Sequence, residues 1–182
     1  KGVNDTLDSV IGPLNVAANY VDRISKGDIP AKITDSYNGD FNTIKNNLNT
    51  CIDAVNALVS DAAMLAKAAV DGKLSTRADA SKHQGDFQRV VKGVNDTLDS
   101  VIGPLNVAAH YVDRISKGDI PAKITDTYNG DFNTIKNNLN TCIDAVNALV
   151  SDAAMLAKAA VEGKLSTRAD ASQHQGDFRK IV

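Results

Sequence analysis

Three histidines and two cysteines are the side chains in this sequence most able to do chemistry. His83 and His174 lie in polar stretches beside Gln and Gly, and His110 stands in an apolar repeat. No two of them are four residues apart, the spacing that places two histidines on one helix face to bind a metal. We therefore expect solvated histidines. The sequence also contains no glycine-rich phosphate loop, nucleophile–base set or carboxylate pair in a cleft, so it predicts no catalytic residues, cofactor or metal.

The two cysteines, Cys51 and Cys142, occupy equivalent positions of a long repeat. One thiol per repeat is not a disulfide framework, and it suits a reducing compartment. Each lies at an apolar position of a predicted helix, so we expect a small core residue. The sequon at Asn4-Asp5-Thr6 carries little weight in a chain expected to be cytoplasmic.

Composition and charge exclude several classes of protein. The 182 residues are 43% hydrophobic and 23% charged, with a net charge of −2, which is ordinary globular composition. A nearly neutral chain gives no electrostatic reason to expect nucleic acid. No apolar run approaches the ~18–20 residues of a membrane span, and there is no signal peptide. We expect a cytoplasmic chain without membrane insertion, in a parent protein that could itself be membrane-anchored.

Internal repetition organises the chain. Residues 92–182 repeat residues 1–91 with only seven differences. A weaker repeat lies inside each copy, because the Gly27-Asp28-Ile29 turn returns 45 residues later as Gly72-Lys73-Leu74. Two related but distinct modules therefore alternate. Both ends of the sequence cut through predicted helices, so we expect a fragment of a longer array.

Long amphipathic helices are the elements that the repeat predicts. Apolar residues spaced alternately by three and four form a heptad seam with a second stripe beside it, a width typical of four-helix bundles. The predicted core and junction positions are Phe41, Ile44, Leu48, Cys51, Val55, Leu58, Phe87, Val94 and Leu98. Pro13 and Pro104, each after a Gly, predict a kink or break.

Glycine and aspartate punctuate the predicted helices. Helices are expected to end at Gly27, Gly72, Gly118 and Gly163 and to start behind the N-cap residues Asp40, Asp86, Asp131 and Asp177. Phenylalanine follows each of these aspartates, either as core filling or as a layer that locks one module onto the next; both interpretations stay open.

Connectors of about 12 residues separate the helices. If extended, such a link runs back along a helix of ~16 residues, so that the two helices of a module lie parallel. Each connector carries a pair of apolar anchors expected to dock between the helices: Ile29 and Ile33, Leu74 and Ala78, Ile120 and Ile124, Leu165 and Ala169. One such pair of helices cannot bury two wide faces. We therefore predict an all-α fold of parallel homodimeric four-helix coiled-coil bundles stacked end to end.

This pattern resembles the HAMP domain, the linker module of bacterial chemoreceptors and sensor histidine kinases. The matching features are the helix opening near Pro13, the Gly27-Asp28-Ile29 turn, the anchors Ile29 and Ile33, and the second helix behind Asp40. The alternating form resembles a poly-HAMP array of the di-HAMP type. We expect a helix tail over 1–9 and modules over 10–55, 56–100, 101–146 and, truncated, 147–182.

The resemblance implies a homodimer that relays conformational signals between a sensor input and the adjacent signalling domains of its parent. Overlapping apolar stripes suggest how: Ile44, Leu48 and Ile52 compete with Ile44, Leu48 and Cys51 as the core face. A helix with two usable faces can rotate between them. Two alternatives stay open: a passive coiled-coil spacer, and a monomeric helical-repeat scaffold that binds a partner.

Overall fold

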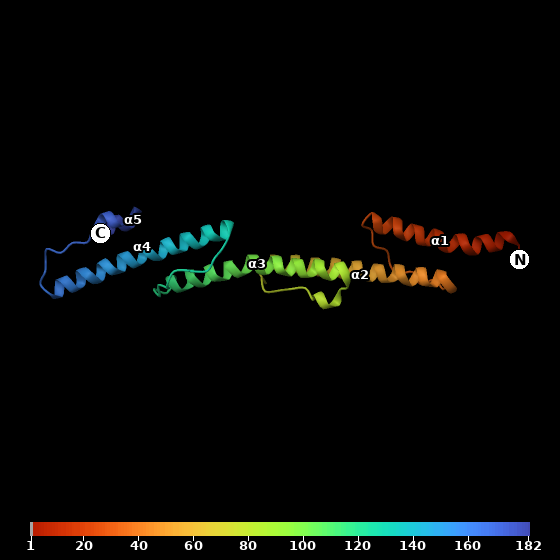
Figure 1. Cartoon of the computed structure of the whole chain (residues 1–182), viewed down its shortest axis with the longest axis horizontal. Coiled ribbons are helices and arrows are strands. Elements are labelled where there is room, and N and C mark those ends of the chain that lie inside the picture. Colours follow the sequence, from red (N-terminus) through yellow and green to blue (C-terminus); the bar gives the residue numbers. More distant parts are fainter. Residues whose placement is uncertain (1) are drawn as a thin grey trace. The chain divides into compact units, whose positions relative to one another are not determined.

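The computed structural model describes residues 2–182, and every regular element in that range is helical (Figure 1). The elements are α1 (Val3–Ser25), α2 (Gly39–Val70), η1 (Ala80–Lys82), α3 (Gly85–Ser116), α4 (Gly130–Val161), η2 (Ala171–Gln173) and α5 (Gly176–Ile181). The all-α prediction is confirmed. Lys1, the first residue of the predicted tail over 1–9, lies outside the described residues.

The chain divides into two compact units, residues 1–98 and residues 99–182. The division falls close to the predicted boundary between the second and third modules, at 100/101. The first unit holds α1, α2, η1 and the start of α3. The second holds the rest of α3 with α4, η2 and α5. The four module boundaries remain a prediction.

Glycines end the helices that lead into the connectors. Gly27 and Gly72 adopt φ angles of 80° and 70°, in the left-handed region that disfavours residues with a Cβ atom. Behind α2, the amide of Gly72 donates to the carbonyl of Ala69 at 3.1 Å, and the amide of Lys73 donates to that of Ala68 at 2.8 Å. This is the Schellman arrangement, and α1, α3 and α4 end in the same way at Gly27, Gly118 and Gly163.

The helix starts differ from the expectation that aspartates are N-caps. α2 begins at Gly39, the N-cap is Asn38, and no side chain caps the first turn. Asp40 lies inside that turn, where its carboxylate faces the positive end of the helix dipole. Asp86, Asp131 and Asp177 lie in the first turns of α3, α4 and α5. The aspartates therefore act on the helix ends by charge rather than as caps.

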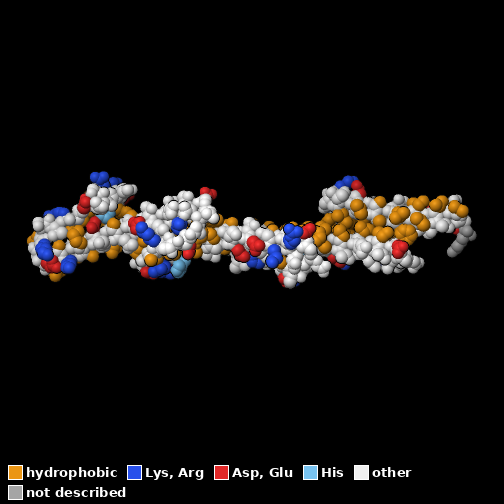
Figure 2. All heavy atoms as spheres, in the orientation of Figure 1, with side chains coloured by type: hydrophobic (Ala, Val, Ile, Leu, Met, Phe, Trp, Pro, Cys, Tyr) orange, Lys and Arg blue, Asp and Glu red, His pale blue; other side chains and the backbone are white. Residues whose placement is uncertain are grey.

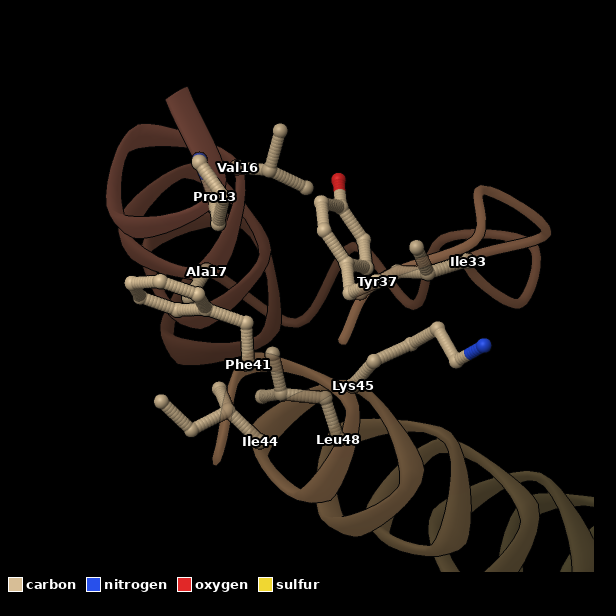
Figure 3. Close-up of a pocket in the computed structure, with 9 residues that line it drawn as sticks. All are labelled: Pro13, Val16, Ala17, Ile33, Tyr37, Phe41, Ile44, Lys45 and Leu48. Carbon is tan, nitrogen blue, oxygen red and sulfur yellow. The ribbon is translucent and has the colours of Figure 1, made fainter. Parts of the chain in front are cut away.

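Neither proline breaks its helix. Pro13 lies inside α1 and Pro104 lies inside α3, and both helices are assigned without interruption. Of the predicted kink or break at the Gly-Pro pairs, the break is therefore wrong, and the kink stays a prediction. A proline removes one backbone hydrogen bond, and the half-buried ring of Pro13 packs beside Phe41 of α2 (Figure 3). The apolar contact offsets part of the lost bond.

The first connector runs antiparallel to the helix that follows it. Lys32 pairs with Asp53 of α2, the backbone of Ile33 bonds to Asn49, and the Asp35 carbonyl accepts from Lys45. Along these three contacts, the residue numbers of the connector rise while those of the helix fall. The connector therefore returns along α2, and α1 and α2 run parallel (Figure 1). The extended-connector prediction is confirmed for this pair.

The buried side chains lie where helices meet connectors. The buried aliphatic residues are Ile33, Ile52, Ala68, Ala78 and Val91 in the first unit and Ile102, Ile124, Ile143 and Ala159 in the second. Pro30, Pro121, His83 and His174 are buried as well. Much of the helical seam stays uncovered. Val10, Leu14 and Ile44 are exposed in the first unit, and Figure 2 shows hydrophobic side chains gathered over α1 and the start of α2. A single chain therefore covers only one side of its apolar helices.

Candidate functional site

The four connectors are where polar and apolar side chains converge. We call residues 26–38 and 117–129 the odd connectors, and residues 71–84 and 162–175 the even connectors. Each odd connector lies between two helices of its own unit. After an opening turn it contains no helix or strand, only a bend at Asp35 or Asp126. Each even connector contains a short 3-10 turn, η1 or η2.

An asparagine amide holds each odd connector onto the helix that follows it. The Asn49 side chain accepts from the amide of Ile33 at 2.8 Å and donates to the carbonyl of Ile33 at 3.0 Å. Asn140 makes the same two bonds to Ile124, at the same distances. Because both backbone groups of the anchor are satisfied by one side chain, the connector can be buried without a polar penalty.

Exposed ion pairs reinforce this attachment. Lys32 Nζ lies 2.6 Å from an oxygen of Asp53, and Lys123 lies 2.7 Å from Asp144. All four side chains are more than half exposed, so each pair adds about 0–1 kcal/mol. The pairs fix the position of the odd connectors more than they stabilise the fold.

The odd connectors meet the preceding helix through apolar contacts. In the first unit, Tyr37 of the connector lies beside Val16 of α1, and Phe41 lies against Pro13 and Ala17 (Figure 3). The second unit repeats this groove, with Tyr128 and Val107 in place of Tyr37 and Val16. The enclosed space is about 10 Å³ in each, hardly more than a single water needs. These grooves are packed contacts rather than ligand sites.

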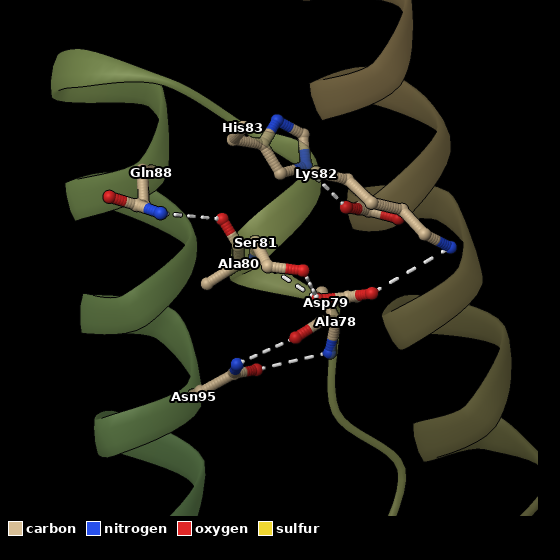
Figure 4. A network of polar contacts seen from close by, with 9 residues as sticks. Ala78, Asp79, Ala80, Ser81, Lys82, His83, Gln88 and Asn95 are labelled. Atoms are coloured by element: carbon tan, nitrogen blue, oxygen red, sulfur yellow. Dashed lines mark hydrogen bonds and ion pairs between the residues drawn. The ribbon is translucent and has the colours of Figure 1, made fainter.

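Asparagine also holds the first even connector. Asn95 of α3 accepts from the amide of Ala78 at 3.1 Å and donates to its carbonyl at 2.8 Å (Figure 4). Gln88, also on α3, donates to the carbonyl of Ala80 at 3.1 Å. The even connector is thus attached to its following helix by the same bidentate amide as the odd one.

A buried histidine ties each even connector to the helix before it. Nε2 of His83 lies 2.6 Å from Oδ2 of Asp61 on α2, and the histidine side chain is only 2% exposed. His174 and Asp152 repeat the contact at 2.6 Å, with 1% exposure of the histidine. This corrects the expectation of solvated histidines for His83 and His174, whereas His110 is exposed as expected. The carboxylate across the connector gives the imidazole a hydrogen-bond partner, which makes its burial tolerable.

An aspartate shapes the turn of each even connector. The carboxylate of Asp79 accepts from the hydroxyl of Ser81 at 2.6 Å and from its amide at 3.0 Å. The hydroxyl bond chiefly, and the amide bond next, lower the pKa of Asp79. Asp170 accepts from Ser172 in the same way, and its pKa is lowered for the same reasons.

Arginine fixes the start of each odd connector. Nε of Arg23 donates to Asp28 at 2.7 Å, and that hydrogen bond lowers the pKa of the exposed Asp28 carboxyl. Arg114 binds Asp119 through two nitrogens, and its hydrogen bonding lowers the pKa of Asp119. The last turn of the preceding helix is thereby joined to the first residues of the connector.

The predicted anchors are buried to different depths. Ile33, Ile124 and Ala78 are buried. Ile29, Ile120 and Ala169 are half-buried, whereas Leu74 and Leu165 are exposed. The exposed leucines depart from the expectation, because the even connectors dock through Ala78 and His83 instead.

The predicted core positions divide in the same way. Phe41, Leu48, Val55, Leu58 and Leu98 are half-buried, whereas Ile44, Phe87, Val94 and Cys51 are exposed. Cys142 is exposed too. A cysteine expected in the core thus lies on the side of the helix that its own chain leaves uncovered.

The sequence did not predict the asparagine clips, by which we mean the paired hydrogen bonds from an asparagine side chain to the backbone of a connector anchor. Asn49 and Asn95 follow their anchors by 16 and 17 residues. Asn140 repeats Asn49 in the second copy. An asparagine recurs at an equivalent position in the second helix of each of the first three modules, and this recurrence was the available signal. Asp61 and His83 recur together too, but nothing in their spacing of 22 residues indicates a contact.

Residues 2–182 contain neither a membrane-spanning helix nor a metal-binding cluster. No helix there combines the length and hydropathy needed to cross a bilayer. No three His, Cys, Asp or Glu side chains in that range gather where they could hold a metal ion.

The family comparison agrees with this arrangement of helices and connectors. A family model described as the HAMP domain matches residues 1–57 and 82–148, more than half of the chain. No solved structure matches the chain. HAMP domains are signalling linkers, rather than catalysts, in chemoreceptors and kinases. Two matched segments in one chain, each spanning a helix, an odd connector and a second helix, show that this chain belongs to the HAMP domain family as a tandem array.

Proposed function

We propose that this chain relays conformational change along a parallel homodimer, between a sensor input and an output domain of a bacterial chemoreceptor or sensor kinase. The observation that carries the proposal is the uncovered seam. Connectors cover one side of each helix, while Ile44 and Cys51 of the heptad seam stay exposed in the single chain. A second copy, packed in parallel, would bury that seam and close each helix pair into a four-helix bundle.

Light scattering across a dilution series tests the dimer. We expect a mass near twice the 19.2 kDa of the chain at every concentration above the dissociation constant. A mass equal to one chain throughout the series would contradict the dimer and favour a monomeric binding scaffold. The parallel course of α1 and α2 within one unit already disfavours a solenoid of short-turned antiparallel helices.

Two competing helix faces support a switching relay over a passive spacer. Ile52, on the stripe with steps of four, is 1% exposed, whereas the neighbouring Cys51, on the heptad stripe, is exposed. In α3 the division is reversed: Val91, on the heptad stripe, is buried, whereas Val90, on the stripe with steps of four, is exposed. Both faces of each helix are apolar, so a rotation exchanges one apolar contact for another at small cost.

A chimera tests whether rotation carries the signal. The array would be placed between a sensor and an output domain, in a background that carries Cys51→Ala and Cys142→Ala. In one variant, a new cysteine pair would lock the helices with the stripe of Ile52 facing the core. In the other variant, a different pair would lock them with the heptad stripe facing the core. We expect opposite outputs from the two locked forms. Identical outputs would make the array a passive spacer. A cytoplasmic location follows from such a parent protein.

A further inference from the structure

The buried pair formed by Asp61 and His83 has an apolar counterpart in the odd modules. The repeat inside each copy relates helix positions by 45 residues, so Val16 is the counterpart of Asp61. It relates positions near the end of the connector by 46 residues, so Tyr37 is the counterpart of His83. Val16 and Tyr37 lie beside each other in Figure 3. The second copy repeats both versions, with Asp152 and His174 in the even connector and Val107 and Tyr128 in the odd one.

The first even connector is therefore bonded to both helices of its module. Asn95 holds Ala78 to the following helix, and Asp61 holds His83 to the preceding one. The polar side-chain contacts of the first odd connector reach the body of α2. On α1 they reach the last turn, at Asp22 and Arg23. Along the rest of α1, this connector makes the apolar contact of Tyr37 with Val16.

These two contacts respond differently to movement. A hydrogen bond of 2.6 Å with a buried donor is directional, and it weakens steeply when either group rotates. An apolar contact is not directional, and a ring can slide along a helix while staying out of water. A preceding helix can therefore rotate against an odd connector at less cost than against an even one.

We propose that His83 and His174 are positioning residues that fix each even connector to the helix before it. Rotation of a module's first helix is thereby confined to the odd modules, and the even modules transmit it as rigid pieces. The inference rests on the proposed relay for its biological meaning, but the restraint itself is a property of the folded array.

Spin labels on exposed, equivalent positions measure the restraint. One label pair joins Ala18 of α1 to Ser36 of the odd connector. The matched pair joins Ala63 of α2 to Lys82 of the even connector; all four positions are exposed. The background would carry Cys51→Ala and Cys142→Ala. Mixing labelled chains with an excess of unlabelled chains removes distances between copies. We expect the even distance distribution to be about twofold narrower than the odd one.

Two variants of Asp61 separate the bond from the packing. Asp61→Asn keeps an oxygen that accepts from Nε2–H of His83, so the even distribution should stay narrow. Asp61→Leu has the same branched shape, with methyl groups in place of the oxygens and no acceptor, and it should broaden the distribution to the odd width. Equal widths for the odd and even pairs in the native array, or for the Asn and Leu variants, would overturn the proposal.

Exchanging the two versions provides the converse test. Asp61→Val with His83→Tyr places the odd pair in the even connector, and Val16→Asp with Tyr37→His does the reverse. We expect the widths to exchange as well, with helix content by circular dichroism unchanged. If the distance distribution of each connector keeps its native width despite the exchange, the restraint comes from the 3-10 turn, and the proposed role of the histidine is overturned. Because these distances need no signalling output, this result can fail while the relay stands, and the relay can fail in a chimera while the restraint stands.

Discussion

The odd connector of the first unit buries an isoleucine, Ile33, where the even connector buries an alanine, Ala78. The three carbon atoms that distinguish these side chains represent about 2 kcal/mol of apolar burial, at ~0.8 kcal/mol each. The even connector has a buried histidine bonded to Asp61 instead, and a hydrogen bond to a charged group contributes about 1.5–3 kcal/mol. The two connectors are therefore held with similar energies by different interactions: apolar burial in the odd connector and a buried hydrogen bond in the even one.

The family match follows the same division. The matched segments, residues 1–57 and 82–148, contain both isoleucine anchors of the odd connectors and exclude Ala78. They also exclude Asp61 and begin only one residue before His83. The family pattern therefore matches where the anchor is a large apolar residue. It leaves out Asp61, one half of the polar clamp that Asp61 and His83 form.

The largest effect should come from exchanging the anchors. Ile33→Ala leaves a cavity under the odd connector and should lower the free energy of unfolding by about 2–5 kcal/mol. Ala78→Ile overpacks the even connector, at a cost of about 1–3 kcal/mol. Thermal or denaturant unfolding at one fixed protein concentration measures both. Equal, small effects would mean that the anchors are not docked as described.

Removing the acceptor of the clamp should have the next largest effect. Asp61→Ala leaves His83 buried without its partner and should destabilise the fold by about 1.5–3 kcal/mol. Asp53→Ala is the matched control, because it removes an exposed ion pair of the odd connector worth about 0–1 kcal/mol. Chemical unfolding compares the two variants. A larger loss from Asp53→Ala than from Asp61→Ala would refute the contrast between the connectors.

The asparagine clips should behave alike in both connectors, since their geometry is alike. Asn49→Ala and Asn95→Ala each remove two hydrogen bonds to an anchor's backbone, at about 1–2 kcal/mol after partial recovery by water. Hydrogen exchange should show faster exchange of the Ile33 amide in the first variant and of the Ala78 amide in the second. An amide whose exchange is unchanged would show that its asparagine does not hold it.

Acid should loosen the even connectors at their turn, as it should loosen the odd connectors at Asp28, whose pKa is lowered by Arg23. The folded-state pKa of Asp79 is lowered from 3.8 by its bonds to Ser81. Its contribution is therefore complete above that value and is lost as the pH falls through the lowered folded-state pKa. The effect should be small, because the group is exposed. Below pH 3.8, Asp79→Asn should lose less stability on further acidification than the native chain. Parallel acid unfolding curves would contradict this.

The fold was predictable because its signals repeat. Glycine stops, heptad spacing and connector length recur in register, and each reports local backbone geometry or periodicity. The clamp was not predictable, because a histidine in a polar stretch carries no sign of the helix that will cover it. Asp61 lies 22 residues earlier, and only the return of the connector brings the two together. The Gly-Pro pairs left a kink and a break both open for a related reason: the packing of Pro13 against Phe41 involves residues from different helices.

The two natural thiols test the central claim, a parallel dimer, most directly. Cys51 and Cys142 are exposed in the single chain and lie on its uncovered seam. A short bismaleimide applied to the native chain at low concentration, followed by peptide mass spectrometry, reports which thiols meet. A parallel, in-register dimer predicts cross-links that join Cys51 to Cys51 and Cys142 to Cys142 of a second copy. Cross-links that join Cys51 to Cys142, or their complete absence while both thiols are modified singly, would contradict the account.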